Sequence, residues 1–231
     1  MKAPISVIIP TLNCADRIRP TIASLFEGLD AGLICELIIS DGESSDDIEM
    51  FAEELGAAFI SSPAGRGRQL RRGAVVAKGD WLLFLHADTV LIDGWSKEVL
   101  RFITPGQDRA AVFRLTFDAY GLAPRFVANW ANFRTRYLGL PYGDQGLLIS
   151  HTLYESVGGF PDIPLMEDVA MARSLRGKIA LLTCRVQTSA EKYEQQGWLR
   201  RGSKNLLLLA RYFLGTSLDK LALSYKDRKA D

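Results

Sequence analysis

The sequence lacks the cysteine patterns of secreted and zinc-binding proteins. Its 231 residues include three cysteines, Cys14, Cys35 and Cys184, which are odd in number and scattered along the chain. They offer neither a disulfide framework nor a zinc-ligand spacing, so we expect a reducing, cytoplasmic compartment. The formal net charge of +1 and the lack of a broad basic patch give no reason to expect nucleic-acid binding.

Long apolar segments are absent too. No run approaches the roughly 18 apolar residues that a membrane-spanning helix needs. The N-terminus has no long apolar region and no small-residue cleavage site, so no signal peptide is expected. With 48% hydrophobic and 24% charged residues, the composition is that of an ordinary globular protein. The length suits one α/β domain, with or without an appendage.

Short apolar strands alternate with helices through the first 90 residues. We expect strands at 6–9, 36–40, 58–61 and 81–85, with helices at 16–26, 44–55 and 68–77. This alternation is typical of parallel βαβ units. After residue 94 the pattern loosens. It predicts helices at 94–103 and 167–175 and strands at 110–116, 147–150 and 179–182.

The stretch GDWLLFLHADT at 79–89 joins a predicted strand to potential metal ligands. Its apolar run indicates a strand buried on both faces, and ligands bind beyond the carboxyl ends of such strands. Alternation would place His86 and Asp88 on one side and Ala87 on the other. A carboxylate there could hold a divalent ion that bridges phosphate oxygens. On the motif alone, a turn-forming Asp88 beside a hydrogen-bonded His86 is the better interpretation.

A glycine-rich basic loop, Gly65-Arg66-Gly67-Arg68, follows the third predicted strand. Its backbone and its guanidinium groups could approach phosphates. A solvated basic loop explains the same residues equally well.

Aromatic residues recur at helical spacing between residues 126 and 137: Phe126, Trp130, Phe133 and Tyr137. We interpret most of this stripe as the core-facing side of a helix. The same segment carries three arginines: Arg125, Arg134 and Arg136. They could reach an anionic substrate, but solvated charges are the preferred interpretation.

Residues 195–218 contain no acidic residue. On a helical wheel their four basic residues fall within one arc of about 100°: Arg200, Arg201, Lys204 and Arg211. Apolar side chains cluster on the other side, which is typical of a helix that lies in a membrane interface with its basic residues toward anionic headgroups. A terminal helix packed on the domain or on a dimer partner is the alternative.

Four motifs occur in the order found in the family 2 glycosyltransferases: VIIPTLN (7–13), ELIISDG (36–42), GDWLLFLHADT (79–89) and GGFP (158–161) followed by Glu167-Asp168. Over about residues 4–190 the chain resembles this family, and its FLHADT and YGDQ motifs resemble a bacterial subfamily. The resemblance implies an α/β domain of the GT-A fold, with a mostly parallel sheet flanked by helices. Residues 1–90 would bind the nucleotide, 91–190 the acceptor, and 191–231 would form a C-terminal amphipathic helical segment.

The resemblance also implies an activity, namely inverting, metal-dependent transfer of a sugar from a nucleotide-diphosphate sugar to an acceptor hydroxyl. Asp168 is the predicted general base, with Glu167 beside it. The alternative is that both acids decorate a helix N-terminus. Predicted nucleotide-sugar contacts are Pro10, Thr11, Asn13, Asp41, Gly65, Arg66, Gly67, Arg68 and Ala87. Predicted acceptor-side residues are Tyr142, Asp144 and Gln145.

Two positions depart from the family pattern. His86 replaces the first Asp of the Asp-X-Asp motif, so Asp88 and His86 are the predicted ligands of Mn²⁺ or Mg²⁺, and an imidazole favours Mn²⁺. Arg71 stands where the family often has Asn.

The donor base, uridine or guanosine, stays open, as does an acceptor on a lipid or another envelope component. Peripheral contact with the inner face of the cytoplasmic membrane is expected. The alternatives are a sugar-nucleotide nucleotidyltransferase and a non-catalytic protein that binds nucleotide sugars or a membrane surface.

Overall fold

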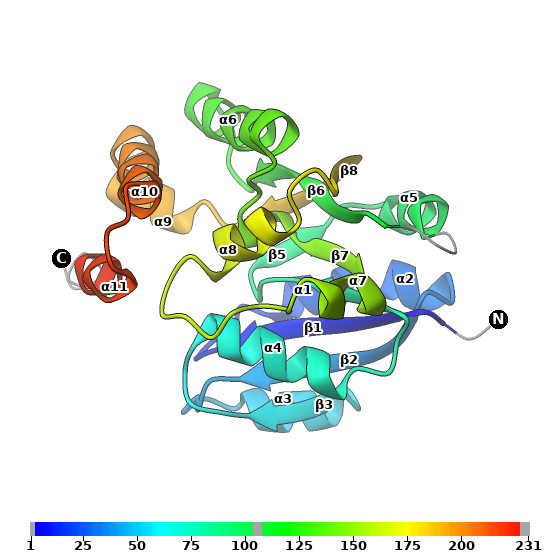
Figure 1. The fold of residues 1–231 in the computed structure, drawn as a ribbon. Coiled ribbons are helices and arrows are strands. Elements are labelled where there is room, and N and C mark those ends of the chain that lie inside the picture. The colour runs from blue at the N-terminus through cyan, green and yellow to red at the C-terminus, as the bar shows by residue number, and fades with distance from the viewer. Residues whose placement is uncertain (1–2, 104–107, 227–231) are drawn as a thin grey trace.

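The computed structural model describes residues 3–103 and 108–226, and these build one eight-stranded mixed sheet with helices on both faces (Figure 1). The strand order is β3-β2-β1-β4-β7-β6-β8-β5. The pairs β1–β2, β1–β4, β2–β3 and β6–β8 are parallel. The pairs β4–β7, β6–β7 and β5–β8 are antiparallel, so the sheet is parallel on the N-terminal side and mixed beyond β4.

The first half of the chain is a series of βα units, as the alternation predicts. Its elements are β1 (Ile5–Thr11), α1 (Arg19–Ser24), α2 (Phe26–Asp30), β2 (Ile34–Asp41), α3 (Ile48–Glu54), β3 (Ala58–Ser61), α4 (Arg66–Val76) and β4 (Trp81–Phe84). The first helix begins at Arg19, later than the predicted residue 16, with Pro20 in its first turn. That position suits proline, whose missing N–H has no helical partner there.

The second half completes the sheet and adds a helical end. Its elements are β5 (Thr89–Leu91), α5 (Trp95–Phe102), β6 (Ala110–Phe117), α6 (Leu122–Leu138), the 3₁₀ turn η1 (Gly143–Gln145), β7 (Leu147–Ser150), α7 (His151–Ser156), α8 (Glu167–Ser174), β8 (Ile179–Thr188), α9 (Glu191–Gln196), α10 (Trp198–Phe213) and α11 (Leu218–Lys226). The predicted C-terminal segment thus contains three helices, and residues 227–231 lie outside the described part of the chain.

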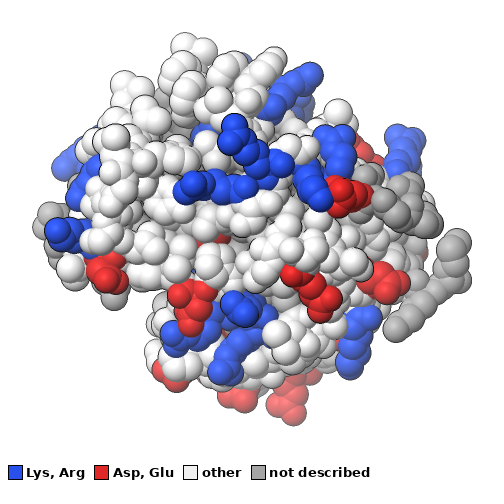
Figure 2. Space-filling model, viewed as in Figure 1, with Lys and Arg blue, Asp and Glu red and all other residues white. Residues whose placement is uncertain are grey.

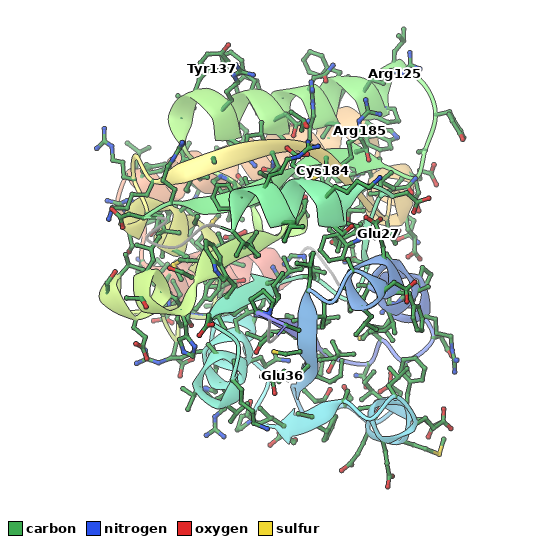
Figure 3. The ribbon with its side chains drawn as sticks, turned by 90° about the vertical axis from the view of Figure 1, so that its right-hand side faces the viewer. Glu27, Glu36, Arg125, Tyr137, Cys184 and Arg185 are labelled. Atoms are coloured by element: carbon green, nitrogen blue, oxygen red, sulfur yellow. The ribbon has the colours of Figure 1, made fainter. Side chains whose placement is uncertain are left out.

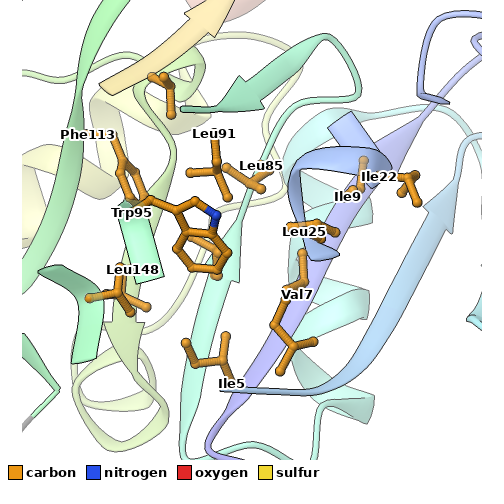
Figure 4. Close-up of a cluster of buried hydrophobic side chains, with 14 of the residues drawn as sticks. Ile5, Val7, Ile9, Ile22, Leu25, Leu85, Leu91, Trp95, Phe113 and Leu148 are labelled. Carbon is orange, nitrogen blue, oxygen red and sulfur yellow. The ribbon is translucent and has the colours of Figure 1, made fainter. Parts of the chain in front are cut away.

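Two hydrophobic clusters cover the two faces of the sheet. One joins alternate residues of β1 (Ile5, Val7 and Ile9) to Trp95 of α5 and Phe113 of β6 (Figure 4). The other joins residues of the opposite strand face to α4, α7 and α8. Strand alternation sends neighbouring side chains into different clusters, which is why the unbroken apolar runs of β1 and β4 are buried throughout.

The polar residues that end the parallel strands meet at one edge of the sheet, the edge formed by the carboxyl ends of these strands. Thr11 of β1 is in register with Asp41 of β2, and Asp41 with Ser61 of β3. β4 runs parallel to β1, so the residues after Phe84 emerge at this same edge. The fold therefore gathers the ends of β1, β2 and β4, where the sequence predicts nucleotide and metal contacts.

β4 ends earlier than predicted, at Phe84, and Ala87 and Asp88 form a turn. Strand alternation therefore does not set the directions of His86, Ala87 and Asp88, and the prediction that His86 and Asp88 share one side for that reason is wrong.

The aromatic stripe of α6, predicted to face the core, lies instead on the exposed side of the helix. Phe126, Trp130, Phe133 and Tyr137 are all exposed, between 43% and 67%. The face that packs on the sheet presents small and polar residues instead, among them Ala128 and Asn132. Arg134, expected in solvent, is buried. Hydrophobic periodicity gave the helix correctly but assigned its buried face wrongly.

Candidate functional site

Asp41 organises the ends of β1 and β2. Its buried carboxylate accepts hydrogen bonds from the Thr11 hydroxyl at 2.8 Å, the Ser44 hydroxyl at 2.6 Å and the Ser44 backbone N–H at 2.7 Å. Asn13, in the left-handed region with φ 49°, accepts from the Ser45 N–H at 2.9 Å. These bonds brace the loop, so Asp41 has structural partners besides any nucleobase contact.

Gln69 of α4 also holds the ends of β1 and β2 together. Its buried side-chain amide donates to the backbone carbonyls of Thr11 at 2.7 Å and Ser40 at 2.9 Å. The Thr11 carbonyl also accepts the Gly42 N–H. Both donors bond to the Thr11 carbonyl, so Gln69 holds the end of β1 in place.

The basic loop becomes the first turn of α4. Arg66 lies 3.3 Å from Glu167, whereas Arg68 pairs with the exposed Asp162 at 2.9 Å. Gly67 lies between them, where α4 approaches the backbone of Pro161. α4 is thus anchored to the segment that leads into α8, and Arg66 points toward the acidic pair.

Gly67→Ala is expected to lower the stability of the protein. A Cβ at Gly67 would overlap the Pro161 carbonyl oxygen, a backbone atom that cannot rotate away. Overpacking of this kind typically costs about 1–3 kcal/mol. Urea unfolding of the two proteins measures the difference. Gly65→Ala is the matched control, because its Cβ would meet only ordinary contacts; equal losses in both variants would contradict the prediction.

His86 and Asp88 follow β4 but face different surroundings. The His86 imidazole packs with its Nε2 edge against Gly143 of η1. Burial, followed by the positive charges of Arg66 and Lys192, holds the pKa of His86 well below its usual range, so the ring is neutral. Asp88 is 36% exposed and lies 4.0 Å from the Lys192 ammonium of α9. Of the two predicted ligands, Asp88 has the open approach.

A pocket lies between β4, η1 and α8. It is lined by Arg66, His86, Glu167 and Asp168 together with apolar residues of the second hydrophobic cluster. The Asp168 carboxylate accepts hydrogen bonds from the Gly143 N–H at 3.0 Å and the Val169 N–H at 2.7 Å. η1 and α8 are thereby tied together, and the predicted base reaches the pocket beside the predicted metal loop.

Glu167 differs from Asp168 in its environment. Its side chain is almost fully buried at the start of α8. Burial raises the pKa of Glu167, the Arg66 guanidinium opposes that rise, and the Asp168 carboxylate adds to it. Repulsion between the adjacent acids is therefore a secondary cause, and desolvation is the main one.

Asp144 and Arg134 form a second polar group beside the pocket. Arg134 donates from Nε to the Leu140 carbonyl at 2.7 Å, and its guanidinium lies 3.4 Å from the centre of the Tyr142 ring. Burial raises the pKa of Tyr142 to about 12. Burial also raises the pKa of Asp144 to about 6; Arg134 opposes this rise, and Asp168 and Asp88 add to it. Within the described residues, Arg134 Nη2 and Asp144 Oδ1 have no hydrogen-bond partner.

Asp144→Asn is expected to stabilise the protein above about pH 6 and to have little effect near pH 4. The folded pKa of Asp144 is about 6, above the ordinary value, so the folded state binds more protons and stability falls as pH rises through this window. The neutral Asn removes that penalty, which is roughly 1–3 kcal/mol. Urea unfolding in EDTA at both pH values tests this. The exposed Asp162→Asn serves as control, and a pH-independent difference for Asp144→Asn would contradict it.

Gln145 is a predicted acceptor-side residue that the structure uses elsewhere. It is fully buried, donates to the Phe113 carbonyl at 3.1 Å and accepts from the Thr135 hydroxyl at 2.5 Å. It therefore anchors η1 to β6 and α6 and does not line the pocket. Tyr142 does line the pocket.

The Asp88 carboxylate fits a hard divalent cation whose remaining ligands are other oxygen atoms. Within residues 3–103 and 108–226, no three His, Cys, Asp or Glu side chains form a complete metal cage. Mg²⁺ and similar ions do not need one, since one or two carboxylates plus phosphate oxygens suffice. Asp88 is accessible, and Asp144 Oδ1 lacks a partner among the described atoms. His86 is less suited, because Gly143 covers its Nε2 edge.

No sequence pattern indicates Lys192, and the sequence places Arg134 in solvent although the side chain is buried. Lys192 lies about one hundred residues from Asp88 in the chain, and only the return of β8 and α9 brings it near. Arg134 belongs to α6, whose aromatic periodicity predicted the wrong buried face. No local pattern marks either position.

The family model described as Glycosyl transferase family 2 matches residues 6–151. The chain belongs to glycosyl transferase family 2. An uncharacterized glycosyltransferase of Rickettsia bellii is 30% identical over 158 residues, covering 66% of this chain and 52% of that protein. A glucosyl-3-phosphoglycerate synthase of Mycolicibacterium paratuberculosis is 34% identical over 95 residues, covering 37% and 29%.

Among solved structures, Staphylococcus aureus TarS 1–349 has a TM-score of 0.62 at 18% identity, covering 83% of this chain and 62% of that one. The same TarS fragment in complex with UDP-GlcNAc has a TM-score of 0.61 at 16% identity, covering 80% and 58%. These likenesses concern the fold alone, and they confirm the predicted GT-A-type α/β architecture. The chain spans about half the length of the Rickettsia relative and less of the mycobacterial one.

Proposed function

We propose that this family 2 protein transfers a sugar from a nucleotide-diphosphate sugar to an acceptor hydroxyl, with inversion at the anomeric carbon. One observation carries the proposal: a single pocket brings Asp168, Arg66 and the loop after β4 together at the carboxyl edge of the sheet. TarS, a structural neighbour, is known in complex with UDP and with UDP-GlcNAc. A uridine nucleotide is therefore the first donor to test.

In the proposed reaction, the acceptor oxygen forms a bond to the anomeric carbon while the bond from that carbon to the diphosphate oxygen breaks. The acceptor proton passes to the Asp168 carboxylate, and the bonding electrons leave with the diphosphate. The carboxylate's hydrogen bonds from Gly143 and Val169 fix its orientation, as a general base requires. Attack on the side opposite the leaving group gives inversion.

The leaving diphosphate needs positive charge around it. A divalent ion, Mn²⁺ or Mg²⁺, would be held by Asp88 and would supply Lewis-acid stabilisation of the departing oxygens. Arg66 and Lys192 contribute further positive charge, since both act on His86. Neutral His86 packs under Gly143 and supports η1, whose N–H orients Asp168.

The acceptor hydroxyl is proposed to lie on a lipid or another envelope component at the inner face of the cytoplasmic membrane. No described helix is long and apolar enough to cross a bilayer. α10 nevertheless exposes Leu199, Leu206 and Leu207 to solvent, which supports peripheral contact of the C-terminal segment.

Product analysis tests the reaction. The protein is incubated with UDP-sugars and GDP-sugars and Mn²⁺, and the released phosphates are separated. Nucleoside diphosphate release is expected. Pyrophosphate released from a nucleoside triphosphate and a sugar phosphate would instead assign a nucleotidyltransferase. Binding of nucleoside diphosphate without turnover and without need of a metal would indicate a non-catalytic binding protein.

A further inference from the structure

The outer face of α6 is a continuous apolar and aromatic surface. The exposed fractions are 84% for Leu122, 67% for Phe126, 43% for Trp130, 48% for Phe133 and 66% for Tyr137. These positions are three or four residues apart and so share one helix face. Trp130 and Phe133 stack with centroids 5.9 Å apart, and Phe133 and Tyr137 lie 4.7 Å apart. We call this set the α6 stripe.

The α6 stripe points outward because the opposite face of the helix is firmly seated. Asn132 both donates to and accepts from the backbone of Leu115 in β6, at 3.0 and 2.8 Å. Thr135 donates to Gln145, and Ala128 and Ala131 lie in the main hydrophobic cluster. Rotating the helix to bury the aromatic residues would break these buried hydrogen bonds. The exposure of the stripe is thus a property of the fold.

α10 adds a second apolar face beside α6, with which it is in contact. Leu208 and Leu209 of α10 are buried in a hydrophobic cluster with Met166 and Val169 at the start of α8. The outward side of α10 carries residues between 49% and 84% exposed: Leu199, Leu206, Leu207, Phe213 and, just beyond its end, Leu214. Exposed apolar side chains gathered on two adjacent helices typically mark an interaction site.

The charged residues of α6 and α10 themselves are all of one sign. Neither α6 nor α10 contains an aspartate or a glutamate. Arg125 and Arg136 lie on the exposed side of α6, and Arg200 on that of α10. Figure 3 shows Arg125 and Tyr137 toward opposite ends of α6, on its outer side. In Figure 2 the surface over α6 and α10 is mostly white with blue patches.

We propose that α6 and α10 together form a docking surface for an anionic lipid bilayer. Aromatic and aliphatic side chains flanked by arginine suit the headgroup region, where the rings enter the interface and the cations meet lipid phosphates. A second copy of the chain fits less well, because two such faces would bring arginines together with no carboxylate on either helix to pair them. The lipid surface supplies the negative charge that the protein lacks here.

This docking extends the membrane contact of the proposed function to α6 and would orient the proposed transferase site; this point rests on the proposed function. α6 leads directly through residues 139–142 into η1, and its buried Arg134 holds Leu140 and Tyr142. The helix at the lipid surface is therefore continuous with the wall of the pocket. An acceptor presented at that surface would approach the pocket from the side of η1.

Vesicle co-sedimentation at low salt tests the proposal. The wild-type protein is mixed with vesicles of phosphatidylglycerol and phosphatidylcholine, or of phosphatidylcholine alone. We expect binding to the anionic vesicles that weakens with added salt. A stripe variant, Phe126→Ser with Trp130→Ser and Tyr137→Ser, should bind at least about tenfold more weakly, since membrane affinity scales with buried apolar area. The charge variant Arg125→Glu with Arg136→Glu should lose the preference for anionic lipid.

The matched control removes exposed apolar residues from other helices: Val75→Ser, Val76→Ser and Leu100→Ser, which are 78%, 43% and 59% exposed in the wild type. It should bind vesicles like the wild type. Failure of the wild type to sediment, or equal binding by the stripe variant, would overturn the proposal. So would stripe-dependent self-association in sedimentation velocity, which would assign the surface to a second copy. Nucleoside diphosphate binding, measured in parallel, reports separately on the transferase site.

Discussion

Asp168→Asn is expected to lower kcat by about 10²–10⁴-fold, the range lost when a general base is removed. The amide cannot take the acceptor proton at neutral pH, but it has nearly the same shape. The KM for the donor should change little, because the donor is held by other groups. Steady-state kinetics of nucleoside diphosphate release, with saturating acceptor, measures both constants.

Two comparisons keep this prediction specific. Asp162→Asn changes an exposed carboxylate of the same segment that pairs with Arg68, and it should keep near wild-type kcat. The amide at 168 can still accept one of the two backbone hydrogen bonds, so the melting temperature should fall only slightly. A variant that folds normally and retains most of its kcat would show that Asp168 is a structural acid at the start of α8.

Asp88→Ala is expected to abolish the metal-dependent binding of nucleoside diphosphate. In the wild type, ligand at about 100 times its Kd with Mn²⁺ stabilises the native state by about 2.7 kcal/mol. For a chain of this length that raises the melting temperature by roughly 5–10 °C. The shift should require Mn²⁺ and vanish in the variant. A thermal-shift screen with UDP and GDP would also identify the donor base.

The exposed Asp93→Ala is the control for a nearby lost carboxylate, and it should keep the full shift. A shift that persists in Asp88→Ala without metal and disappears in Lys192→Ala would contradict the assignment. That result would mean that Lys192, whose ammonium lies 4.0 Å from the Asp88 carboxylate in the wild type, neutralises the diphosphate. Loss of the shift in both variants would mean that the ion and the ammonium act on the same diphosphate.

The N-terminal half was well predicted because its signals are local. Unbroken apolar runs such as residues 81–85 suit strands covered on both faces, and their spacing leaves room for helices between them. The polar residues after β1 and β2 then follow from chain direction, which brought Thr11 and Asp41 together as expected. Motif order gave the family, and the match to residues 6–151 confirms it.

The predictions failed where the sequence does not show which side of a helix the rest of the protein covers. Phe126 and Trp130 have the periodicity of a core stripe, yet α6 is held by Asn132 and Thr135 on its other side. Periodicity reports that a face is apolar, but not whether protein covers it. The sequence alone likewise did not reveal that Gln145 is consumed by buried hydrogen bonds, or that the strand stops before His86.

By itself, the sequence determined the alternation of strands and helices, the family, and the gathering of polar residues at one sheet edge, since these depend on neighbouring residues and on the direction of each strand. Only the tertiary structure decided which face of α6 meets solvent, that Lys192 lies beside Asp88, and that Gly143 covers His86 and orients Asp168. These depend on contacts between segments far apart in the chain, whose energies no short stretch of sequence contains.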